Sequence, residues 1–382
     1  MPLVFVDHRG AGEPQALVCP APQNLDSISD PAVTNACGRS LGPRRTHFNS
    51  ANIPRDLSMV KTALNIAKWS MWGVSYGAAV VTECIRMFPT DAKTCVLDSA
   101  YVLSQRAGRT SEFYQTSNEV ARSVCERANV CEVDACLQNL RTVLKDLRLN
   151  PRQPDVLGSL FNIVFNPISL VEGNMSKVLE SAANGKCTNL EALVLETETS
   201  VTPFFGNRKV LLFGFLKAIN CLESALAWGP YADKDEQLAK FEGELLRANP
   251  EEFDPFLPEE VLKFSGVEDD CLGWPKLPEG VNFNDLVPCP TGPIDNKGVP
   301  VLMMNGEYDL LTTVADGRRA TMRFKFNARF AKVASAGLSI GRISSCGSKL
   351  GLDFVRSGRL PNTSRCSNPA TQPLLVSSQL IH

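Results

Sequence analysis

The fold of this 382-residue chain is decided by residues 68–88, KWSMWGVSYGAAVVTECIRMF. Residues 68–72 predict a short strand, and residues 78–88 predict an apolar helix that ends before Pro89. Between them, Gly73-Val74-Ser75-Tyr76-Gly77 matches the pattern G-x-S-x-G. The pattern requires a sharp turn from strand to helix that strains the serine backbone and exposes its hydroxyl. We therefore predict a nucleophilic serine, Ser75, at the start of a helix.

The residues around Ser75 match the needs of acyl transfer. Gly73 and Gly77 let neighbouring backbone approach closely. The helix N-terminus and the backbone N–H of Tyr76 would stabilise the negative charge on a reacting carbonyl oxygen. The alternative is a serine in an ordinary glycine turn, and the flanking strand and small-residue helix favour the nucleophile.

Strands and helices alternate outward from this point, which predicts parallel βαβ units and an α/β fold. The predicted strands are 3–6, 68–72, 94–97, 299–305 and 329–334, and the predicted helices are 54–66, 78–88, 313–323 and 348–356. Residues 19–50 are rich in Pro, Asn and Ser and predict loops. Residues 104–275 show mostly helical spacing. We expect an N-terminal core part at 1–103, a helical lid insertion at 104–280 and a C-terminal core part at 281–382.

Composition excludes several classes of protein. Charged residues make up 21 % of the chain and hydrophobic residues 44 %, which is typical of globular domains and not of disordered or coiled-coil chains. The formal net charge of −2 gives no reason to expect a nucleic-acid or anionic-membrane partner. No run of eighteen apolar residues is present, so we expect no membrane span.

The thirteen cysteines indicate an oxidising compartment. They lack the paired spacing of zinc sites, so we expect no metal, and nothing in the sequence implies a cofactor. Cys84 and Cys95 lie in apolar runs and are expected to be buried free thiols. The sequons at Asn174 and Asn362 agree with secretion. The chain nevertheless starts without a signal peptide, so we expect a secreted ancestry with the leader missing.

These segments together resemble an α/β-hydrolase. More closely, they resemble the tripeptidyl aminopeptidase and proline iminopeptidase-like serine peptidases with a TAP-like C-terminal region. The resemblance runs through the chain in the family's order, in segments 4–12, 55–57, 72–78, 95–99, 218–221, 271–275, 300–312 and 358–361 with Cys366. It implies a mostly parallel sheet flanked by helices, a large helical lid, and release of N-terminal residues or tripeptides from a peptide or small amide or ester substrate.

The resemblance also assigns the catalytic acid. The order of the family's triad is Ser, Asp, His, so Ser75 takes the nucleophile position and Asp309, just after the strand 299–305, takes the acid position. The alternative for Asp309 is a turn-capping aspartate, and its place after a strand favours the acid. Asp98 also ends a strand and falls at a structural position of the family.

The histidine of the family is absent from its expected place. Leu338 occupies the position, and leucine cannot take a proton from Ser75. The chain has only His8, His47 and His382. We expect His8 to be a turn residue bonded to backbone, His47 to be exposed in a loop, and His382 to belong to a disordered end.

A second departure concerns the family's "HGGPG" loop, which supplies the other oxyanion N–H and has no counterpart here. The sheet is expected to lack its first strands for the same reason. A missing base and half an oxyanion hole predict little or no peptidase activity. Two alternatives stay open: a non-catalytic protein that binds a peptide or partner through the old cleft, and a truncated gene product.

The resemblance further implies two disulfides, Cys346–Cys366 and Cys221–Cys271, and Cys19–Cys37 is plausible because the loop that it closes is local. Acidic lid groups of the family hold the substrate ammonium. The candidates here are Glu223, Glu268, Asp269 and Asp270, for which a solvated surface is the simpler reading.

Overall fold

The structure is a computed structural model. It describes residues 2–12, 16–20, 30–101, 132–150, 156–160, 175–206, 212–224, 226–265, 268–287, 292–309 and 311–368, with a few residues between 115 and 126.

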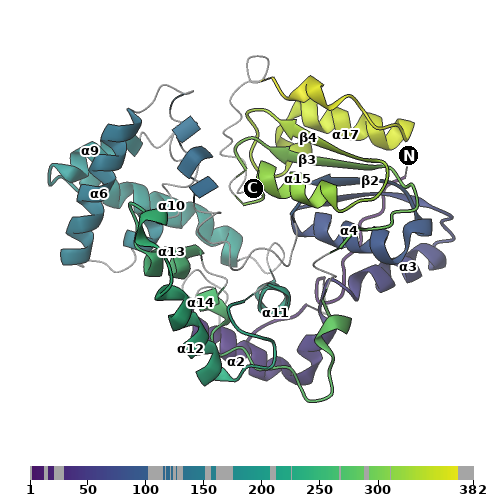
Figure 1. Cartoon of the computed structure of the whole chain (residues 1–382), viewed down its shortest axis with the longest axis horizontal. Coiled ribbons are helices and arrows are strands. Elements are labelled where there is room, and N and C mark those ends of the chain that lie inside the picture. The colour runs from purple at the N-terminus through teal and green to yellow at the C-terminus, as the bar shows by residue number, and fades with distance from the viewer. Residues whose placement is uncertain are drawn as a thin grey trace.

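Four parallel strands form the sheet in the order β1-β2-β3-β4 (Figure 1). They span β1 Trp69–Val74, β2 Ala92–Asp98, β3 Val301–Gly306 and β4 Ala328–Val333. All three pairings are parallel, so the carboxyl ends of the strands share one edge of the sheet. Because β2 and β3 are neighbours, the turns after β1 and β3 lie at that shared edge although more than two hundred residues separate them in sequence.

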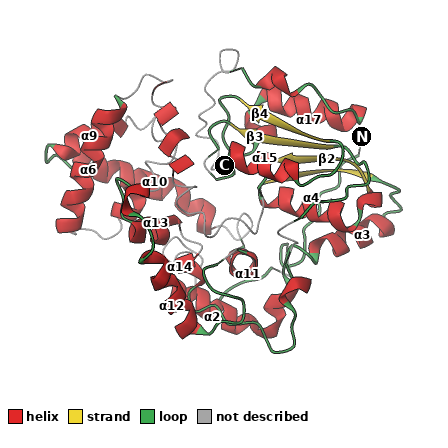
Figure 2. Cartoon of the chain, in the orientation of Figure 1, coloured by secondary structure: helices red, strands yellow, loops and turns green. Residues whose placement is uncertain are grey.

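Helices cover both faces of the sheet, giving three layers (Figure 2). On one face, α4 (Tyr76–Met87) and α15 (Val314–Met322) pack on alternate strand residues such as Leu97 and Met303. On the other face, α16 (Ile340–Ile343) and α17 (Ser345–Ser357) pack on the intervening strand residues, such as Val96 and Leu302. Central strands buried on both faces are continuously apolar. The predicted fold class, an α/β fold with a parallel sheet flanked by helices, is confirmed.

Two segments differ from the predictions. Residues 3–6 form no strand, and Phe5 is 92 % exposed. Among the described residues β1 pairs only with β2, so residues 3–6 add no strand to the open edge of the sheet. Residues 19–50 contain a helix, α2 (Pro31–Leu41), followed by a 3₁₀ turn at Gly42–His47. Helix α2 begins because the Asp30 side chain accepts the N–H of Ala32 and a proline stands at the first helical position, where its missing N–H costs nothing.

The described chain between β2 and β3 is helical. Its helices are α6 Val133–Leu149, α9 Met175–Ala183, α10 Thr188–Gly206, α11 Phe213–Glu223, α12 Lys234–Leu245, α13 Pro258–Ser265 and α14 Glu268–Cys271. They build two further cores. One joins α6, α9 and α10 with Phe253 and Phe256, and the other joins α2 and α11 beside the sheet. Short α3 (Ile53–Ala63) packs on α4. None of the helices in the described ranges is long and apolar enough to cross a membrane.

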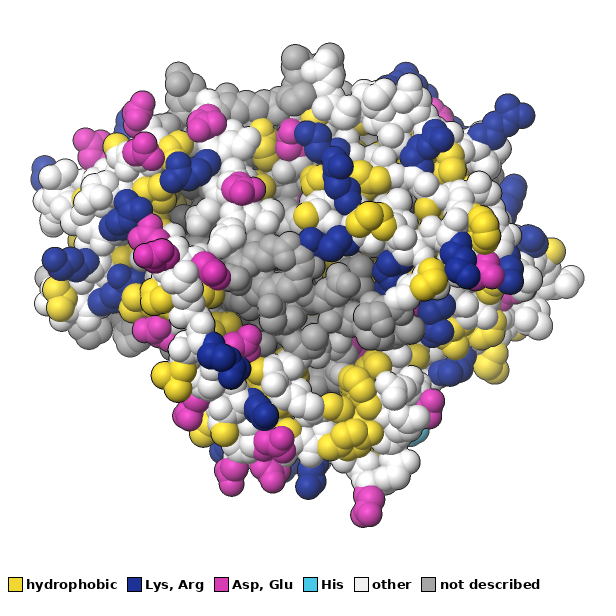
Figure 3. Space-filling view, viewed as in Figure 1, with side chains coloured by type: hydrophobic (Ala, Val, Ile, Leu, Met, Phe, Trp, Pro, Cys, Tyr) yellow, Lys and Arg dark blue, Asp and Glu magenta, His cyan; other side chains and the backbone are white. Residues whose placement is uncertain are grey.

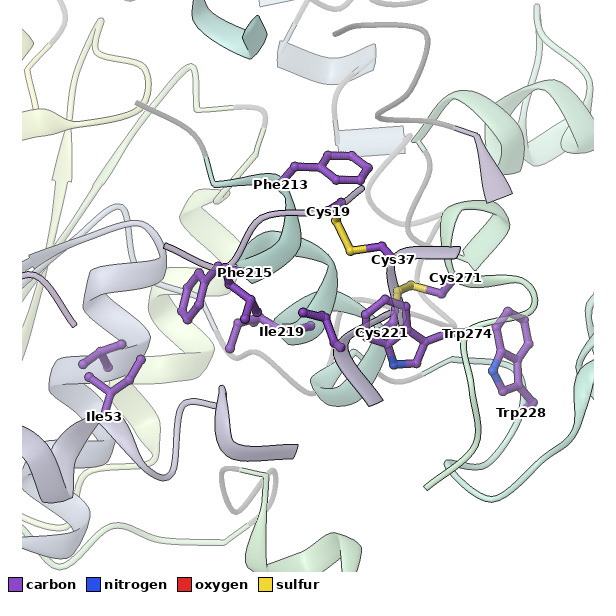
Figure 4. Close-up of a cluster of buried hydrophobic side chains, with 14 of the residues drawn as sticks. Cys19, Cys37, Ile53, Phe213, Phe215, Ile219, Cys221, Trp228, Cys271 and Trp274 are labelled. Carbon is purple, nitrogen blue, oxygen red and sulfur yellow. A yellow bond between two sulfur atoms is a disulfide. The ribbon is translucent and has the colours of Figure 1, made fainter. Parts of the chain in front are cut away.

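Within the described ranges three disulfides form, and each joins a predicted pair: Cys19–Cys37, Cys221–Cys271 and Cys346–Cys366. Figure 4 shows the first two close together around α11. The Cys221–Cys271 bridge ties the end of α11 to α14, so α11 is fixed at its C-terminal end by a covalent link. Cys84 and Cys95 are free and buried, as predicted.

Candidate active site

The turn between β1 and α4 has the geometry of a nucleophile elbow. Ser75 has φ 54° and ψ −117°, a conformation that costs free energy for a residue with a side chain. Its backbone N–H donates to the carbonyl of Asp98, 2.9 Å away, and its own carbonyl accepts the N–H of Ala78 at 2.9 Å. These two hydrogen bonds hold the strained residue between the end of β2 and the first turn of α4.

Gly73 makes the tight turn feasible. A Cβ atom built on Gly73 would lie 2.1 Å from the carbonyl oxygen of Gly77 and 2.7 Å from the backbone nitrogen of Ala78. Strand and helix therefore pass each other at a distance that only glycine allows at this position. Around Gly77 the space is open, with nothing within 4 Å of an added Cβ.

Ser75 is half-buried, and its hydroxyl has no hydrogen-bond partner in the part of the chain that the structure describes. Tyr76 is the first residue of α4, so its backbone N–H has no acceptor within the helix. Within the described residues, an unpartnered hydroxyl and an N–H without a helical acceptor thus stand side by side at the positive end of a helix.

Asp309 lies in the turn after β3 and is 2 % exposed. One carboxylate oxygen accepts the N–H groups of Leu311 and Thr312 at 3.0 and 2.8 Å, and the other accepts the Thr312 hydroxyl. Burial raises the pKa of Asp309 to about 6, and these hydrogen bonds oppose the rise. These local hydrogen bonds are those of a turn-capping aspartate, and Asp309 lies at the same edge of the sheet as the turn that holds Ser75.

The segment that holds Leu338 runs beside the Asp309 turn. The carbonyl of Ala336 accepts the N–H of Tyr308 at 2.9 Å. The N–H of Ser339 donates at 2.8 Å to the hydroxyl of Ser99, which itself donates to Asp98 at 3.3 Å. Leu338 itself is half-buried. The structure therefore brings the predicted acid and the predicted histidine position together, with leucine at the latter.

Asp98 has a structural role that the sequence could only assign by resemblance. It is fully buried, and its carboxylate accepts the N–H groups of Ile340 and Gly341, each at 2.8 Å, at the start of α16. The indole N–H of Trp72 donates to the same group at 3.3 Å. Burial raises its pKa despite these donors. Asp98 thus anchors the segment after Leu338 to the sheet.

Replacing Asp98 with alanine is expected to lower the free energy of unfolding by about 2 kcal/mol, because buried N–H groups lose their acceptor. Chemical denaturation at pH 7 measures the change. Asp316→Ala serves as a comparison, since Asp316 also caps a helix, α15, at a more exposed place. If Asp98→Ala is no more destabilising than Asp316→Ala, the anchoring role is wrong.

A buried polar chain beside the elbow was missed by the sequence analysis. The Tyr76 hydroxyl lies 2.8 Å from the hydroxyl of Ser50, and the Ser50 backbone N–H donates to Oε1 of Glu223 at 2.5 Å. Glu223, at the end of α11, is 4 % exposed. Burial raises its pKa to about 8. The expectation of a solvated Glu223 is wrong, because α11 turns this side chain inward.

Of the other three acidic candidates, only Asp270 has a described side chain. Asp270 pairs with the buried Lys217 at 2.6 Å. An ion pair with a buried lysine leaves Asp270 neutralised within the protein. The side chains of Glu268 and Asp269 lie outside the described residues.

The histidines lie largely where they were predicted. His8 forms a hydrogen bond with the neighbouring carbonyl of Arg9, as expected of a turn residue. Its ring also packs on Phe215, with centroids 4.4 Å apart, and on Tyr76 at 6.3 Å. His47 is exposed, and His382 lies outside the described residues. The described residues contain no cluster of three or more His, Cys, Asp or Glu side chains suited to a metal ion.

One face of the molecule carries both signs of charge (Figure 3). Lys and Arg side chains gather over α15, which contributes Arg318 and Arg319, whereas acidic and basic side chains are mixed over α12.

The sequence matches no family model and no curated protein. Two solved structures are similar to the fold at low identity. One is MGS-M2, an α/β hydrolase enzyme from a Medee basin deep-sea metagenome library, at 13 % identity and TM-score 0.34, covering 82 % of this chain and 74 % of that one. The other is the putative non-heme bromoperoxidase BpoC from Mycobacterium tuberculosis H37Rv, at 14 % identity and TM-score 0.33, covering 82 % and 75 %. The fold assignment rests on the sheet and the elbow themselves.

Proposed function

We propose that this chain carries the nucleophile site of a serine hydrolase, with Ser75 as nucleophile, Asp309 as acid and the Tyr76 N–H as oxyanion donor. The observation that supports this most directly is the strained backbone of Ser75 at the N-terminus of α4, with φ 54°. Strain of this kind persists where the surrounding structure enforces it, and it gathers at functional sites. The proposed substrate class is a peptide or a small amide or ester, by resemblance to exopeptidases that release N-terminal residues or tripeptides.

The proposed site is impaired at one chemical step. When Ser75 Oγ attacks a carbonyl carbon, the new C–O bond forms as the carbonyl π electrons move to the oxygen, and the hydroxyl proton must leave for a base. Leu338 offers no such base, and Ser75 Oγ has no other partner within the described residues. The Tyr76 N–H would still stabilise the oxyanion. We therefore expect slow acylation of Ser75 and little turnover of peptides.

Leu338→His is expected to raise hydrolysis of chromogenic aminoacyl and tripeptidyl amides by about a hundredfold or more, since a base in a triad contributes orders of magnitude. The gain should disappear in Leu338→His combined with Ser75→Ala, and it should shrink with Asp309→Asn. His47→Ala, at an exposed histidine, is the control and should change nothing. A Leu338→His protein that folds and stays inactive on esters as well as amides would contradict the proposed triad.

A second candidate is a non-catalytic protein that binds peptides or a partner at the same place. The Ser75 hydroxyl has no hydrogen-bond partner among the described residues, which favours this candidate, because an active triad would hydrogen-bond that group. Isothermal titration with unlabelled tripeptides separates the two: binding without any acylation of Ser75, even in Leu338→His, supports the binding protein.

A further inference from the structure

The side chain of Tyr76 is held at both ends. Its hydroxyl lies 2.8 Å from the Ser50 hydroxyl. Its ring packs edge-on against Phe215 of α11, with centroids 5.8 Å apart, and against His8 on the segment 2–12. Burial raises the pKa of Tyr76 well above its usual value, so the phenol keeps its proton. A ring fixed by aromatic packing and tethered at its hydroxyl leaves its own backbone little freedom to rotate.

Ser50 is held in turn by α11. It is fully buried, and its backbone N–H donates to Oε1 of Glu223 at 2.5 Å. Its hydroxyl contacts the Tyr76 hydroxyl at 2.8 Å. A buried serine that donates its N–H to Glu223 and contacts Tyr76 through its hydroxyl forms a bridge between the elbow and α11.

Helix α11 gives this bridge a rigid support. Its buried residues Phe213, Phe215 and Ile219 fill the core drawn in Figure 4. The Cys221–Cys271 disulfide lies two residues before Glu223. The second carboxyl oxygen of Glu223, Oε2, is buried without a hydrogen-bond partner among the described residues. Burying an oxygen without a hydrogen-bond partner destabilises the folded protein. Packing alone therefore does not explain why a glutamate occupies position 223.

We propose that Glu223 and Ser50 are positioning residues that act through the Tyr76 hydroxyl to fix the Tyr76 N–H where the oxyanion forms. This inference rests on the proposed function of Ser75. In this proposal α11, a helix remote from β1 in sequence, helps to position the backbone of the turn between β1 and α4. Neither Glu223 nor Ser50 touches the reacting atoms in this role.

The test is the rate at which a fluorophosphonate labels Ser75, measured against probe concentration. Tyr76→Phe, Ser50→Ala and Glu223→Leu each break one contact of the bridge. Each should lower the maximal labelling rate by roughly tenfold. The loss is smaller than that on removing an oxyanion donor, because these variants displace the donor and do not remove it. The probe concentration at half saturation should stay the same, because the bridge orients the donor and does not bind the probe.

Conservative variants and a control separate positioning from folding. Glu223→Gln keeps an acceptor for the Ser50 N–H and should label at nearly the wild-type rate. Glu242→Gln, at an exposed glutamate of α12, should have no effect. Wild-type labelling in a folded Tyr76→Phe protein would overturn the proposal, and so would equal losses in Glu223→Gln and Glu223→Leu.

A second measurement reads the bridge without using reactivity. Melting temperatures of Tyr76→Phe, Ser50→Ala and the double variant should be non-additive, because the two hydroxyls contact each other. If wild-type Ser75 does not label at all, the proposed function fails, and this cycle still decides whether the bridge exists. Additive melting temperatures would overturn the bridge even where Ser75 labels.

Discussion

Gly73→Ala is expected to lower the free energy of unfolding by about 3 kcal/mol, the upper part of the range for overpacking a tight site. The added methyl group would lie 2.1 Å from the Gly77 carbonyl oxygen, which is far inside van der Waals contact. Backbone atoms stand in its way, so no side chain can move aside to accept it. Either β1 and α4 separate or the elbow opens.

Gly77→Ala is the matched control, because nothing lies within 4 Å of a Cβ at Gly77 and the residue belongs to α4. Alanine is better than glycine within a helix by roughly 0.5–1 kcal/mol, so this variant should be neutral or slightly more stable. Urea denaturation of both variants at one pH makes the comparison. Equal stabilities for Gly73→Ala and wild type would contradict the close crossing of strand and helix.

Glu223→Gln is expected to become steadily more stable than wild type as the pH rises from about 4.5 to about 8. In the folded protein burial raises the pKa of Glu223 to about 8, against an ordinary value of 4.5. Between these values the folded state binds a proton that the unfolded state has released. Wild-type stability therefore falls with rising pH, by about 1.4 kcal/mol per pH unit for one such group.

The expected difference between the two proteins thus reaches a few kcal/mol at pH 8 and levels off above it. Below pH 4.5 the acid is protonated in both states, and the difference should stay constant. Asp309, with a pKa of about 6, titrates in both proteins and cancels in the comparison. Urea denaturation at four pH values from 5 to 8 measures the slope. A difference that does not change with pH would show that Glu223 is ionised in the folded protein.

Much of the sheet could be predicted from local sequence. Strands β2 and β3 are apolar runs bounded by charged residues or glycines, and central strands of a parallel sheet take this form. The elbow was predicted because its requirement is local: Gly73 must lack a side chain, and Ser75 must join a strand to a helix. Both demands concern residues adjacent in sequence, so a pattern of five residues could express them.

Other features depend on contacts between distant residues. Residues 3–6 have the composition of a strand, yet a strand also needs a partner, and composition does not provide one. Glu223 is the last residue of α11, and nothing in the neighbouring sequence distinguishes it from a surface glutamate. Its 4 % exposure and its contact with Ser50 appear only in the folded structure. Asp98 likewise gains its role from N–H groups more than two hundred residues away.

The most direct test of the account is to map the adduct formed when the wild-type chain reacts with a fluorophosphonate. Mass spectrometry of the digested protein should find the adduct on Ser75, formed slowly in wild type, faster in Leu338→His and not at all in Ser75→Ala. Absence of an adduct on Ser75 in both wild type and Leu338→His, with both proteins folded, would contradict the claim that this elbow presents a hydrolase nucleophile.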